Sequence, residues 1–447
     1  MKKVHIVGIG GISLSALAKI LLHDGYEVSG SDTCKSKLTE NLEKCGVQVF
    51  YEHKAENVHG ASLVVYTGAV DEQNPELVEA KRQNISVYSR AELLGMLASK
   101  HKKVISVAGS HGKTTTTGML ATIFLLARKN PTVHIGGELP IISGNVHLGS
   151  KKYFITEACE YKDSFLSLAS DYSVILNIQK DHMDYFKNMD NLQNSFEKFA
   201  KNTKQRGFVV ANFDDENCKK IDYKCGVISY GFNDGALVQA KNISEKNQIF
   251  SYDLFVGEKY KTRIILSVPG KHNIYNSLAS ICVALKERIP MQTIKKALAS
   301  YVPSKRRYDK IVDKSGAVIV HDYAHHPTEL SASMKIARAT TKGKLIVVFE
   351  PHTYSRTQYL WREFCTCFNL ADMVFIPPIY PAREKPIKGI TNVTLARGIR
   401  EAGKLAKATK SLKSTYNVLQ KYLQNGNTIM LLGAGTIVHL AEMFGIN

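Results

Sequence analysis

Residues 104–120 read VISVAGSHGKTTTTGML, and this stretch decides the fold of the 447-residue chain. An apolar, β-branched run passes directly into a glycine loop, and a helical pattern begins at Lys113. In such a strand–loop–helix unit, glycines let backbone N–H groups approach phosphate oxygens, and the helix N-terminus favours negative charge. The strict phosphate-loop pattern requires a glycine where this chain has Val107, so the sequence is a variant of that loop. The alternative, a chance Gly-Lys-Thr on a surface turn, fits this context less well.

The side chains of the loop predict an ATP site. The Lys113 ammonium can reach the β- and γ-phosphates, and the Thr114 hydroxyl can ligate Mg²⁺. We therefore expect ATP to contact the whole loop, which consists of Gly109, Ser110, His111, Gly112, Lys113, Thr114 and Thr115.

Polar residues at the ends of two later strands are candidates for the same metal site. Glu157 and Glu160 lie at the end of YFITEACE, and Asp181, His182 and Asp184 follow YSVILNIQ. Taken alone, an acidic strand end is usually solvated, and a single histidine more often caps a loop than binds a metal. The phosphate loop favours the metal-binding interpretation.

Strands and helices alternate on both sides of this stretch, which predicts an α/β fold. We expect three consecutive α/β domains: a Rossmann-like N-terminal domain, a P-loop ATPase-like central domain and a Rossmann-like C-terminal domain. Their predicted ranges are 1–103, 104–302 and 303–447. The Pro-containing basic stretch that starts at residue 302 predicts a hinge near 302–305.

The first strand ends in a second glycine motif. Gly10 and Gly11 follow it, and Asp32 closes the next strand, a spacing typical of dinucleotide binding. Ser13 stands where the third glycine of that fingerprint belongs. The motif is compatible with a nucleotide or nucleotide-sugar diphosphate over the turn, and also with a tight turn that binds nothing.

Two strand ends in the C-terminal domain carry histidines, tyrosines and an arginine. Residues 321–327 read HDYAHHP and residues 352–356 read HTYSR, and we expect these two ends to be adjacent. Arginine and histidine suit the recognition of carboxylates and phosphates. A zinc site lacks ligands at a fitting spacing. A GAG turn at residues 433–435 is interpreted as a helix start.

The composition is that of an ordinary folded protein with an unusual charge. The chain has 59 Lys and Arg against 40 Asp and Glu, a formal net charge of +19, which favours anionic partners. The sequence has no compact basic stripe with interleaved aromatics, so nucleic acid is not expected. Residues 1–103 are nearly neutral, with 13 basic and 12 acidic residues. Lysines recur at every third position, which predicts a solvated helix face, at Lys404, Lys407, Lys410 and Lys413.

We expect no targeting segment at the start of this sequence. The apolar run in MKKVHIVGIGG is too short for a signal peptide. The longest helical apolar run, residues 119–127, falls short of the roughly 20 residues that span a membrane. The eight cysteines form no CxxC pair. We expect a cytoplasmic protein with reduced thiols and no membrane span.

Taken together, the motifs resemble those of the Mur ligase family over nearly the whole chain. The resemblance rests on GIGGISLSALAK, GSD, GSHGKTTTTGM, ACEYKDSF, NIQKDHMDYF, GKHNIYNS, KRRYD, DYAHHPTE, PHTYSRT and IYPAREKPI. It implies an ATP- and Mg²⁺-dependent ligase that joins L-alanine to the carboxylate of UDP-N-acetylmuramate through an acyl phosphate, in peptidoglycan precursor synthesis. The alternative within the fold is a ligase that attaches a preformed peptide to the same sugar nucleotide during wall recycling.

The resemblance also implies a role for each matching residue. UDP would bind at Gly10, Gly11 and Asp32. Lys113 would hold the γ-phosphate, while Mg²⁺ would be organised by Thr114, Glu157 and His182. The remaining nucleotide contacts would be Asn273 and His272 at the adenine, Asp322 at the ribose and Arg307 at the phosphates. Tyr323, His325, His352 and Arg356 would surround the alanine, with His325 as the base.

Two positions depart from many members of the family. Ser13 replaces a glycine, and Thr353 replaces an arginine, so we expect the alanine carboxylate to depend more heavily on Arg356. Some relatives use a carbamylated lysine near the metal; Lys198 is nearby in this sequence, but no motif fixes its alignment.

Overall fold

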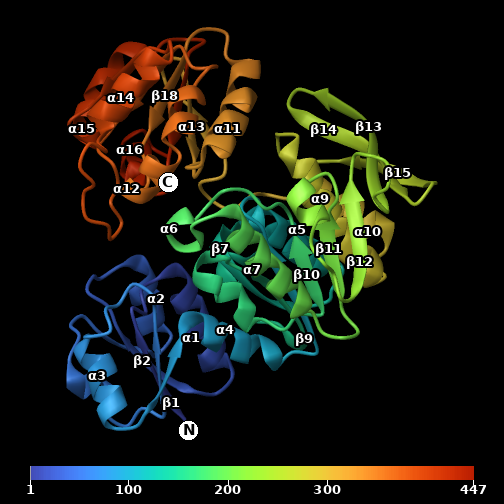
Figure 1. Cartoon of the computed structure of the whole chain (residues 1–447), viewed down its shortest axis with the longest axis vertical. Coiled ribbons are helices and arrows are strands. Elements are labelled where there is room, and N and C mark those ends of the chain that lie inside the picture. Colours follow the sequence, from blue (N-terminus) through green and yellow to red (C-terminus); the bar gives the residue numbers. More distant parts are fainter. Residues whose placement is uncertain (1, 447) are drawn as a thin grey trace. The chain divides into compact units, whose positions relative to one another are not determined.

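The computed structural model describes residues 2–446 and contains three separate β-sheets with helices packed around them (Figure 1). This confirms the predicted fold class of three consecutive α/β domains. The chain divides into two compact units, and the division falls between Ser304 and Lys305. The first unit holds the first two sheets. The second holds the third sheet together with residues 180–187 and 246–249, which the sequence places in the central domain.

The first sheet is parallel, with the strand order β3-β2-β1-β4-β5. The order reverses between β1 and β4, and ligands of open α/β sheets bind beyond the strand ends at such a reversal. Capping boxes at Ser36 and Ser89 fix the starts of α2 and α4. The elements are β1 (Lys3–Val7), α1 (Ile12–His23), β2 (Glu27–Ser31), α2 (Lys37–Lys44), β3 (Gln48–Phe50), β4 (Leu63–Tyr66), α3 (Pro75–Arg82), β5 (Ser86–Ser89) and α4 (Arg90–Ser99).

The second sheet has ten strands in the order β15-β14-β13-β12-β11-β10-β6-β9-β7-β8. Its strands are β6 (Lys103–Ala108), β7 (Pro131–Leu139), β8 (Gly144–His147), β9 (Ser150–Glu157), β10 (Tyr172–Ile175), β11 (Phe208–Asn212), β12 (Gly226–Gly231), β13 (Val238–Lys246), β14 (Ile249–Val256) and β15 (Lys259–Ile265). The longer helices of this region are α5 (Lys113–Leu126), α7 (Met189–Lys201), α9 (His272–Lys286) and α10 (Met291–Ala299).

Helix α5 packs against β7 and β9 of the second sheet and against the helices α9 and α10, which themselves contact β11, β12 and β15. It is buried on nearly all sides from Thr116 to Phe124, as expected for a helix whose apolar residues do not form a single stripe. This position directs its N-terminus, and the glycine loop before it, to the end of β6.

The third sheet has the order β16-β17-β21-β18-β19-β20, parallel except for β16. Its strands are β16 (Asp309–Val312), β17 (Val318–Asp322), β18 (Leu345–Phe349), β19 (Met373–Ile376), β20 (Ala406–Ala408) and β21 (Thr428–Leu432). The helices of the second unit are α6 (Met183–Phe186), α11 (Pro327–Thr340), α12 (Tyr354–Tyr359), α13 (Trp361–Thr366), α14 (Asn392–Glu401), α15 (Leu412–Leu419) and α16 (Ile437–Met443).

Two expectations about the C-terminal region are wrong. The ends of β17 and β18 are not adjacent, because β21 pairs with both strands and lies between them. The evenly spaced lysines do not share a helix face. Lys404 follows α14, Lys407 lies in β20, Lys410 lies in a bend and Lys413 lies in α15. Spacing alone favoured a helix, but the buried Ala406 starts an edge strand in the middle of that stretch.

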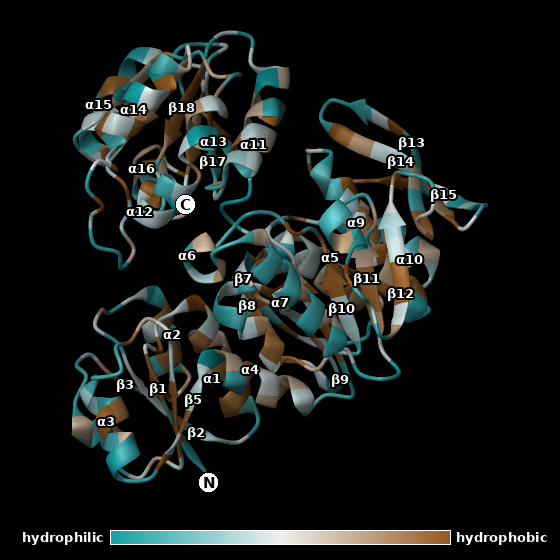
Figure 2. Ribbon diagram, in the orientation of Figure 1, coloured by the Kyte–Doolittle hydropathy of each residue, from teal (hydrophilic) through white to brown (hydrophobic). Residues whose placement is uncertain are grey.

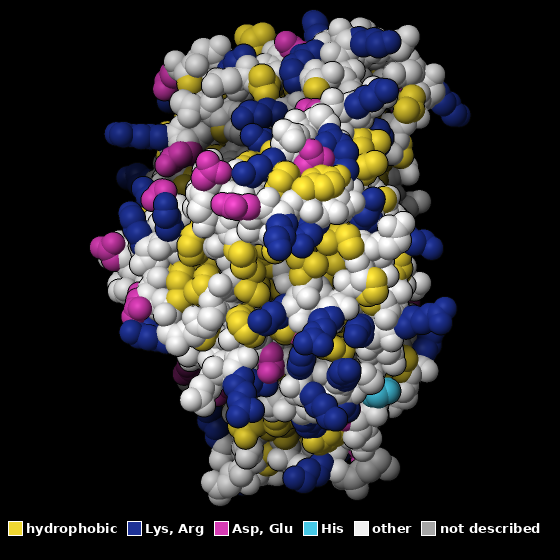
Figure 3. Space-filling view, turned by 90° about the vertical axis from the view of Figure 1, so that its right-hand side faces the viewer, with side chains coloured by type: hydrophobic (Ala, Val, Ile, Leu, Met, Phe, Trp, Pro, Cys, Tyr) yellow, Lys and Arg dark blue, Asp and Glu magenta, His cyan; other side chains and the backbone are white. Residues whose placement is uncertain are grey.

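The buried apolar residues lie in the strands and in the helices that cover them. In Figure 2, β1 and β18 are hydrophobic, and both are buried along most of their length. Figure 3 shows Lys and Arg side chains distributed over the face drawn, where they are more prominent than Asp and Glu. Within residues 2–446, no helix is long and apolar enough to cross a membrane.

Candidate active site

The glycine loop between β6 and α5 is shaped by close packing. Gly112 has a φ of +87°, and a Cβ there would lie 2.5 Å from the side-chain oxygen of Asn276. Gly109 has a φ of +143°, and its Cβ would lie 2.9 Å from that of Leu176. Only glycine fits such positions without strain. The backbone N–H of His111 donates to the Asn177 side chain at 2.9 Å, which ties the loop to the end of β10.

Lys113 lies across this loop. Its ammonium donates to the backbone oxygens of Gly109 (2.5 Å) and Ser110 (3.2 Å) and to both carboxylate oxygens of Glu160 (3.1 and 2.9 Å). The Glu160 side chain is 1% exposed, so the ion pair is shielded from water. The family resemblance gave Glu160 no role, although it follows the same strand as Glu157. Its contact with Lys113 could not be read from spacing alone.

Glu157 and Thr114 lie on either side of a glycine pair in β7. The Gly136 N–H donates to Oε1 of Glu157 at 2.7 Å, and a Cβ on Gly136 would lie 3.1 Å from that oxygen. A Cβ on Gly137 would lie 3.2 Å from Ser304 and 3.6 Å from Thr114. No motif in the sequence predicted a role for this pair. Two glycines inside a strand are the signal that marks a close backbone approach.

The oxygen donors of this region fit a magnesium ion. Mg²⁺ prefers hard oxygen ligands, and it is commonly bound through a carboxylate and hydroxyls together with substrate phosphates. Thr114 supplies a hydroxyl in the first turn of α5. Glu157 supplies a carboxylate whose Oε2 has no hydrogen-bond partner within residues 2–446.

The start of α9 is joined to the glycine loop by two asparagines. The Asn273 side chain donates to the Pro269 carbonyl at 2.7 Å and accepts from Asn276 at 2.9 Å. Asn276 is also the residue with which a Cβ on Gly112 would clash. His272, the first residue of α9, is exposed. Both residues expected at the adenine therefore lie on the helix that borders the loop.

The glycine turn after β1 is held by Asp32. Its Oδ2 accepts from the Gly10 N–H at 2.9 Å, and a Cβ on Gly10 would lie 2.8 Å from the same oxygen. Gly11 is the N-cap of α1, and it is exposed. The carboxylate that was expected at a ribose thus also fixes the turn, at the reversal point of the first sheet.

In the second unit, two arginines lie against one ring. The guanidinium carbons of Arg306 and Arg307 are 4.7 and 5.2 Å from the centroid of Tyr323. Asp322 ends β17 beneath them and accepts from the Ser333 hydroxyl at 2.8 Å. Burial raises the pKa of Asp322 to about 6. A cation brought over this carboxylate would favour its charged form.

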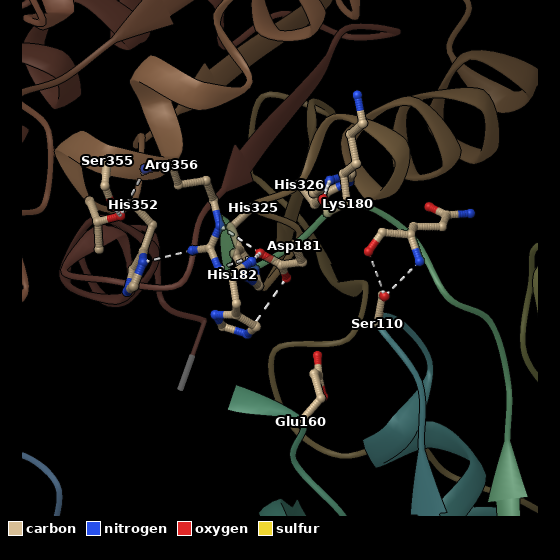
Figure 4. A network of polar contacts seen from close by, with 12 residues as sticks. Ser110, Glu160, Lys180, Asp181, His182, His325, His326, His352, Ser355 and Arg356 are labelled. Carbon is tan, nitrogen blue, oxygen red and sulfur yellow. Dashed lines mark hydrogen bonds and ion pairs between the residues drawn. The ribbon is translucent and has the colours of Figure 1, made fainter. Parts of the chain in front are cut away.

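Arg356 lies at the centre of a second group of residues in this unit (Figure 4). Its Nη2 and Nε donate to Oδ1 of Asp181 at 2.9 and 3.2 Å, and its Nη1 donates to Nδ1 of His352 at 3.0 Å. Thr353 accepts from the Arg356 N–H and is the N-cap of α12, so this departure from the family caps the helix that carries Arg356.

Burial keeps the histidines of this group neutral. Desolvation lowers the pKa of His325 to about 3 and that of His352 to about 4. His325 donates through Nδ1 to the carbonyl of Tyr323 at 3.0 Å, which leaves Nε2 as the acceptor nitrogen.

The GAG turn after β21 also belongs to this end of the third sheet. It leads into α16 as expected, and a Cβ on Gly435 would lie 2.6 Å from the carboxylate of Glu350. Glu350 accepts from the first N–H of α16, that of Ile437, at 3.0 Å. This buried carboxylate could not be predicted from the sequence, because its partner lies 87 residues away.

Three family models match consecutive parts of the chain: "Mur ligase family, catalytic domain" at residues 3–102, "Mur ligase middle domain" at 107–284 and "Mur ligase, glutamate ligase domain" at 306–435. A UDP-N-acetylmuramate–L-alanine ligase of Clostridium novyi is 42% identical over 99% of this chain and 97% of its own length. The chain belongs to the Mur ligase family.

Solved structures agree with this assignment. A UDP-N-acetylmuramate-alanine ligase of Thermotoga maritima matches with a TM-score of 0.84 at 27% identity, covering 100% of this chain and 98% of its own. A murein peptide ligase of Psychrobacter arcticus has the same fold, with a TM-score of 0.73 at 21% identity, covering 99% of this chain and 98% of its own. The resemblance inferred from the motifs is confirmed.

The expected Mur ligase site residues fall into three groups. In the first unit, the structure brings together the glycine loop, Thr114, Glu157 and Asn273, while Gly10, Gly11 and Asp32 lie at the turn after β1. In the second unit, it gathers the residues expected around the alanine, together with Arg307, Asp322 and His182. His182 lies beside Asp181 in the segment that packs with this unit, with its Nε2 3.8 Å from Asp181 Oδ2.

Proposed function

We propose that this Mur ligase joins L-alanine to the carboxylate of UDP-N-acetylmuramate at the expense of ATP, in peptidoglycan precursor synthesis. The observation that supports it most directly is the Lys113 ammonium held over the glycine loop by Glu160, in a chain that is 42% identical to a curated ligase of that name. The domains expected at 1–103, 104–302 and 303–447 would bind UDP-sugar, ATP and the amino acid, respectively.

The proposed reaction has two steps. An oxygen of the muramyl carboxylate attacks the γ-phosphorus of ATP, so that a new O–P bond forms, the bond from this phosphorus to the bridging oxygen breaks, and ADP leaves with that oxygen. The amine of alanine then attacks the carbonyl carbon of the acyl phosphate, and inorganic phosphate leaves. Catalysis consists largely of positioning and of neutralising charge on the transferring group.

The nucleotide would bind across the glycine loop. Lys113 would hold the γ-phosphate, and Arg307, oriented by the ring of Tyr323, would approach the phosphates. His272 and Asn273 would border the adenine, and Asp322 would meet the ribose. Thr114, Glu157 and His182 would hold Mg²⁺, which would neutralise charge on the phosphates when bound.

The amino acid would bind around Arg356. Asp181 and His352 fix the guanidinium, and a substrate carboxylate would compete with Asp181 for its donors. His325 is unprotonated at neutral pH, as a base must be, and its Nε2 is the nitrogen that can accept the proton of the amine. Tyr323 and His325 lie with ring centroids 5.3 Å apart and would border the same pocket.

The sugar nucleotide would bind over the turn at Gly10 and Gly11, which Asp32 holds in place. The first domain is nearly neutral, so the diphosphate would depend on backbone N–H groups at the start of α1 and on individual cations. We place the reaction in the cytoplasm, because all of its proposed substrates are soluble anions or amino acids.

A phosphate-release assay tests the proposal. Enzyme, ATP, Mg²⁺ and UDP-N-acetylmuramate are combined with L-alanine, glycine, L-serine or a wall tripeptide, and Lys113→Ala serves as the inactive control. We expect phosphate release and an amide product with L-alanine. Release with the tripeptide alone would assign the chain to peptide recycling instead and would refute the proposal.

A further inference from the structure

Ser13 replaces the third glycine of the dinucleotide fingerprint, and its side chain connects two domains. Its hydroxyl lies 2.9 Å from Nε2 of His134 in β7, and Nη1 of Arg90 donates to the same hydroxyl at 3.3 Å. His134 Nδ1 in turn lies 2.9 Å from the hydroxyl of Thr156 in β9. That hydroxyl donates to the carbonyl of Glu157 at 3.0 Å. Four side chains therefore form one hydrogen-bonded chain from the glycine turn to the expected metal ligand.

The proton positions in this series of hydrogen bonds follow from the residues at its two ends, Arg90 and Thr156. Arginine only donates, so the Ser13 oxygen accepts from Arg90. The Thr156 hydroxyl gives its single proton to a carbonyl, so it must accept from His134 Nδ1. Nε2 of His134 is then an acceptor and receives the Ser13 proton. Each donor in this series of hydrogen bonds therefore has one acceptor.

The burial of His134 supports this arrangement. His134 is 3% exposed, and desolvation, followed by the nearby charge of Arg90, lowers its pKa to about 3. A neutral imidazole has one donor and one acceptor nitrogen, which the chain requires. The ring is therefore a fixed link that keeps one direction of hydrogen bonding.

Strand β7 holds Glu157 at a second point. Gly136, two residues after His134, donates its N–H to the Glu157 carboxylate, while Thr156 precedes Glu157 in β9. Helix α1 is joined to the same hairpin again, because Asn145 in β8 donates to the carbonyl of Ile12 at 2.5 Å. The start of α1 and the Glu157 carboxylate are thus both positioned by one hairpin.

We propose that His134 is a positioning residue that aligns the glycine turn of the sugar-nucleotide domain with Glu157 of the ATP domain, through the chain Arg90–Ser13–His134–Thr156. The proposal rests on the proposed function, in which the muramyl carboxylate must meet the γ-phosphate. Reacting atoms must approach within about 3–3.5 Å, and a misplacement of about 1 Å costs about 10²-fold in rate. A glycine at position 13 has no hydroxyl and could not form these hydrogen bonds to His134 and Arg90.

The test compares His134→Leu, Ser13→Ala and the double variant. We expect each single variant to lower kcat by about tenfold or more, and the double variant to be no slower than the slower single variant, because both changes break one chain. His147→Leu is the matched control. That histidine lies on the same hairpin in β8, and within residues 2–446 its side chain hydrogen-bonds only to the Pro131 carbonyl, so kcat of this variant should be unchanged.

A binding measurement gives a readout that does not need turnover. Calorimetry of Mg²⁺ with ADP, without sugar nucleotide, should show weaker Mg²⁺-dependent binding in Ser13→Ala by about fivefold, although Ser13 lies in the other domain. Unchanged Mg²⁺–ADP binding together with additive effects on kcat would overturn the proposal, as would lowered melting temperatures with unchanged kcat. A wild-type enzyme that binds Mg²⁺–ADP but releases no phosphate would refute the proposed function instead, and the calorimetric comparison would still test the link.

Discussion

At the scale of single residues, the glycine pair of β7 shows how closely the backbone determines the chemistry. Gly136 and Gly137 have no side chains, and this lets β7 pass between the Glu157 carboxylate on one side and Thr114 with Ser304 on the other. The N–H of Gly136 also directs Oε1 of Glu157, which leaves Oε2 to face a ligand. Two of the three residues expected to hold the metal, Glu157 and Thr114, therefore border a stretch of β7 that carries no side chains.

Gly136→Ala tests this dependence. The new Cβ would lie 3.1 Å from Oε1, so the carboxylate must shift by a few tenths of an ångström. We expect the Mg²⁺ concentration for half-maximal activity to rise about tenfold, while the KM for L-alanine is unchanged. Gly144→Ala is the matched control, because a Cβ there has no atom within 4 Å. Equal Mg²⁺ requirements in the two variants would contradict this assignment.

At the scale of elements, the strand ends of the third sheet carry several buried imidazoles. Desolvation lowers the pKa of His321 to about 4, and His325 and His352 are shifted in the same direction. Below pH ~6.5 these histidines are protonated in the unfolded chain but stay neutral in the folded unit. Stability must therefore fall as the pH falls. Asp322 opposes this, because its raised pKa lets the folded unit take up one proton near pH 6.

The prediction is a pH-dependent unfolding of the second unit. Each shifted histidine contributes a slope of up to about 1.4 kcal/mol per pH unit between pH 6 and 5, and Asp322 offsets one of the three. Trp361, the chain's single tryptophan, lies in α13 and reports on this unit by fluorescence during urea unfolding. His321→Gln should reduce the slope, whereas His439→Gln, an exposed control on α16, should not. Identical slopes in both variants would show that buried His321 is not the source.

At the scale of the whole molecule, the distribution of positive charge agrees with the ligands proposed for the three domains. The first domain is nearly neutral, while residues 303–447 have 21 basic and 10 acidic residues. The basic residues of the C-terminal unit lie over turns, strands and helices, and they do not form a single helix face. A basic background of this kind suits a triphosphate.

The two units meet in the chain at the expected hinge, and this predicts protection by substrates. Val302 is 57% exposed and Lys305 is exposed, so trypsin should cleave the free enzyme after Lys305. If domain closure assembles the site, a nonhydrolysable ATP analogue with UDP-N-acetylmuramate should slow this cleavage about tenfold or more. Lys259, exposed at the edge strand β15, is the internal control. Equal cleavage rates with and without ligands at both sites would exclude closure at this hinge.

Much of this site could be read from the sequence because it depends on local geometry. The loop from Gly109 to Thr115 is a continuous stretch in which each residue type has one chemical use, so its position at the start of α5 followed from the pattern. Glu160 could not be assigned in the same way. Its ion pair with Lys113 joins residues that are 47 positions apart, and no local periodicity records such a distance.

The sequence by itself determined the strand–loop–helix units, the order of three α/β domains and the membership of the Mur ligase family, because periodicity and motif spacing are properties of neighbouring residues. Only the tertiary structure decided that β21 separates β17 from β18, that the glycine pair lies between Glu157 and Thr114, and that Ser13 reaches His134. Strand order and contacts between side chains depend on which distant segments share a core, and burial in three dimensions selects those partners.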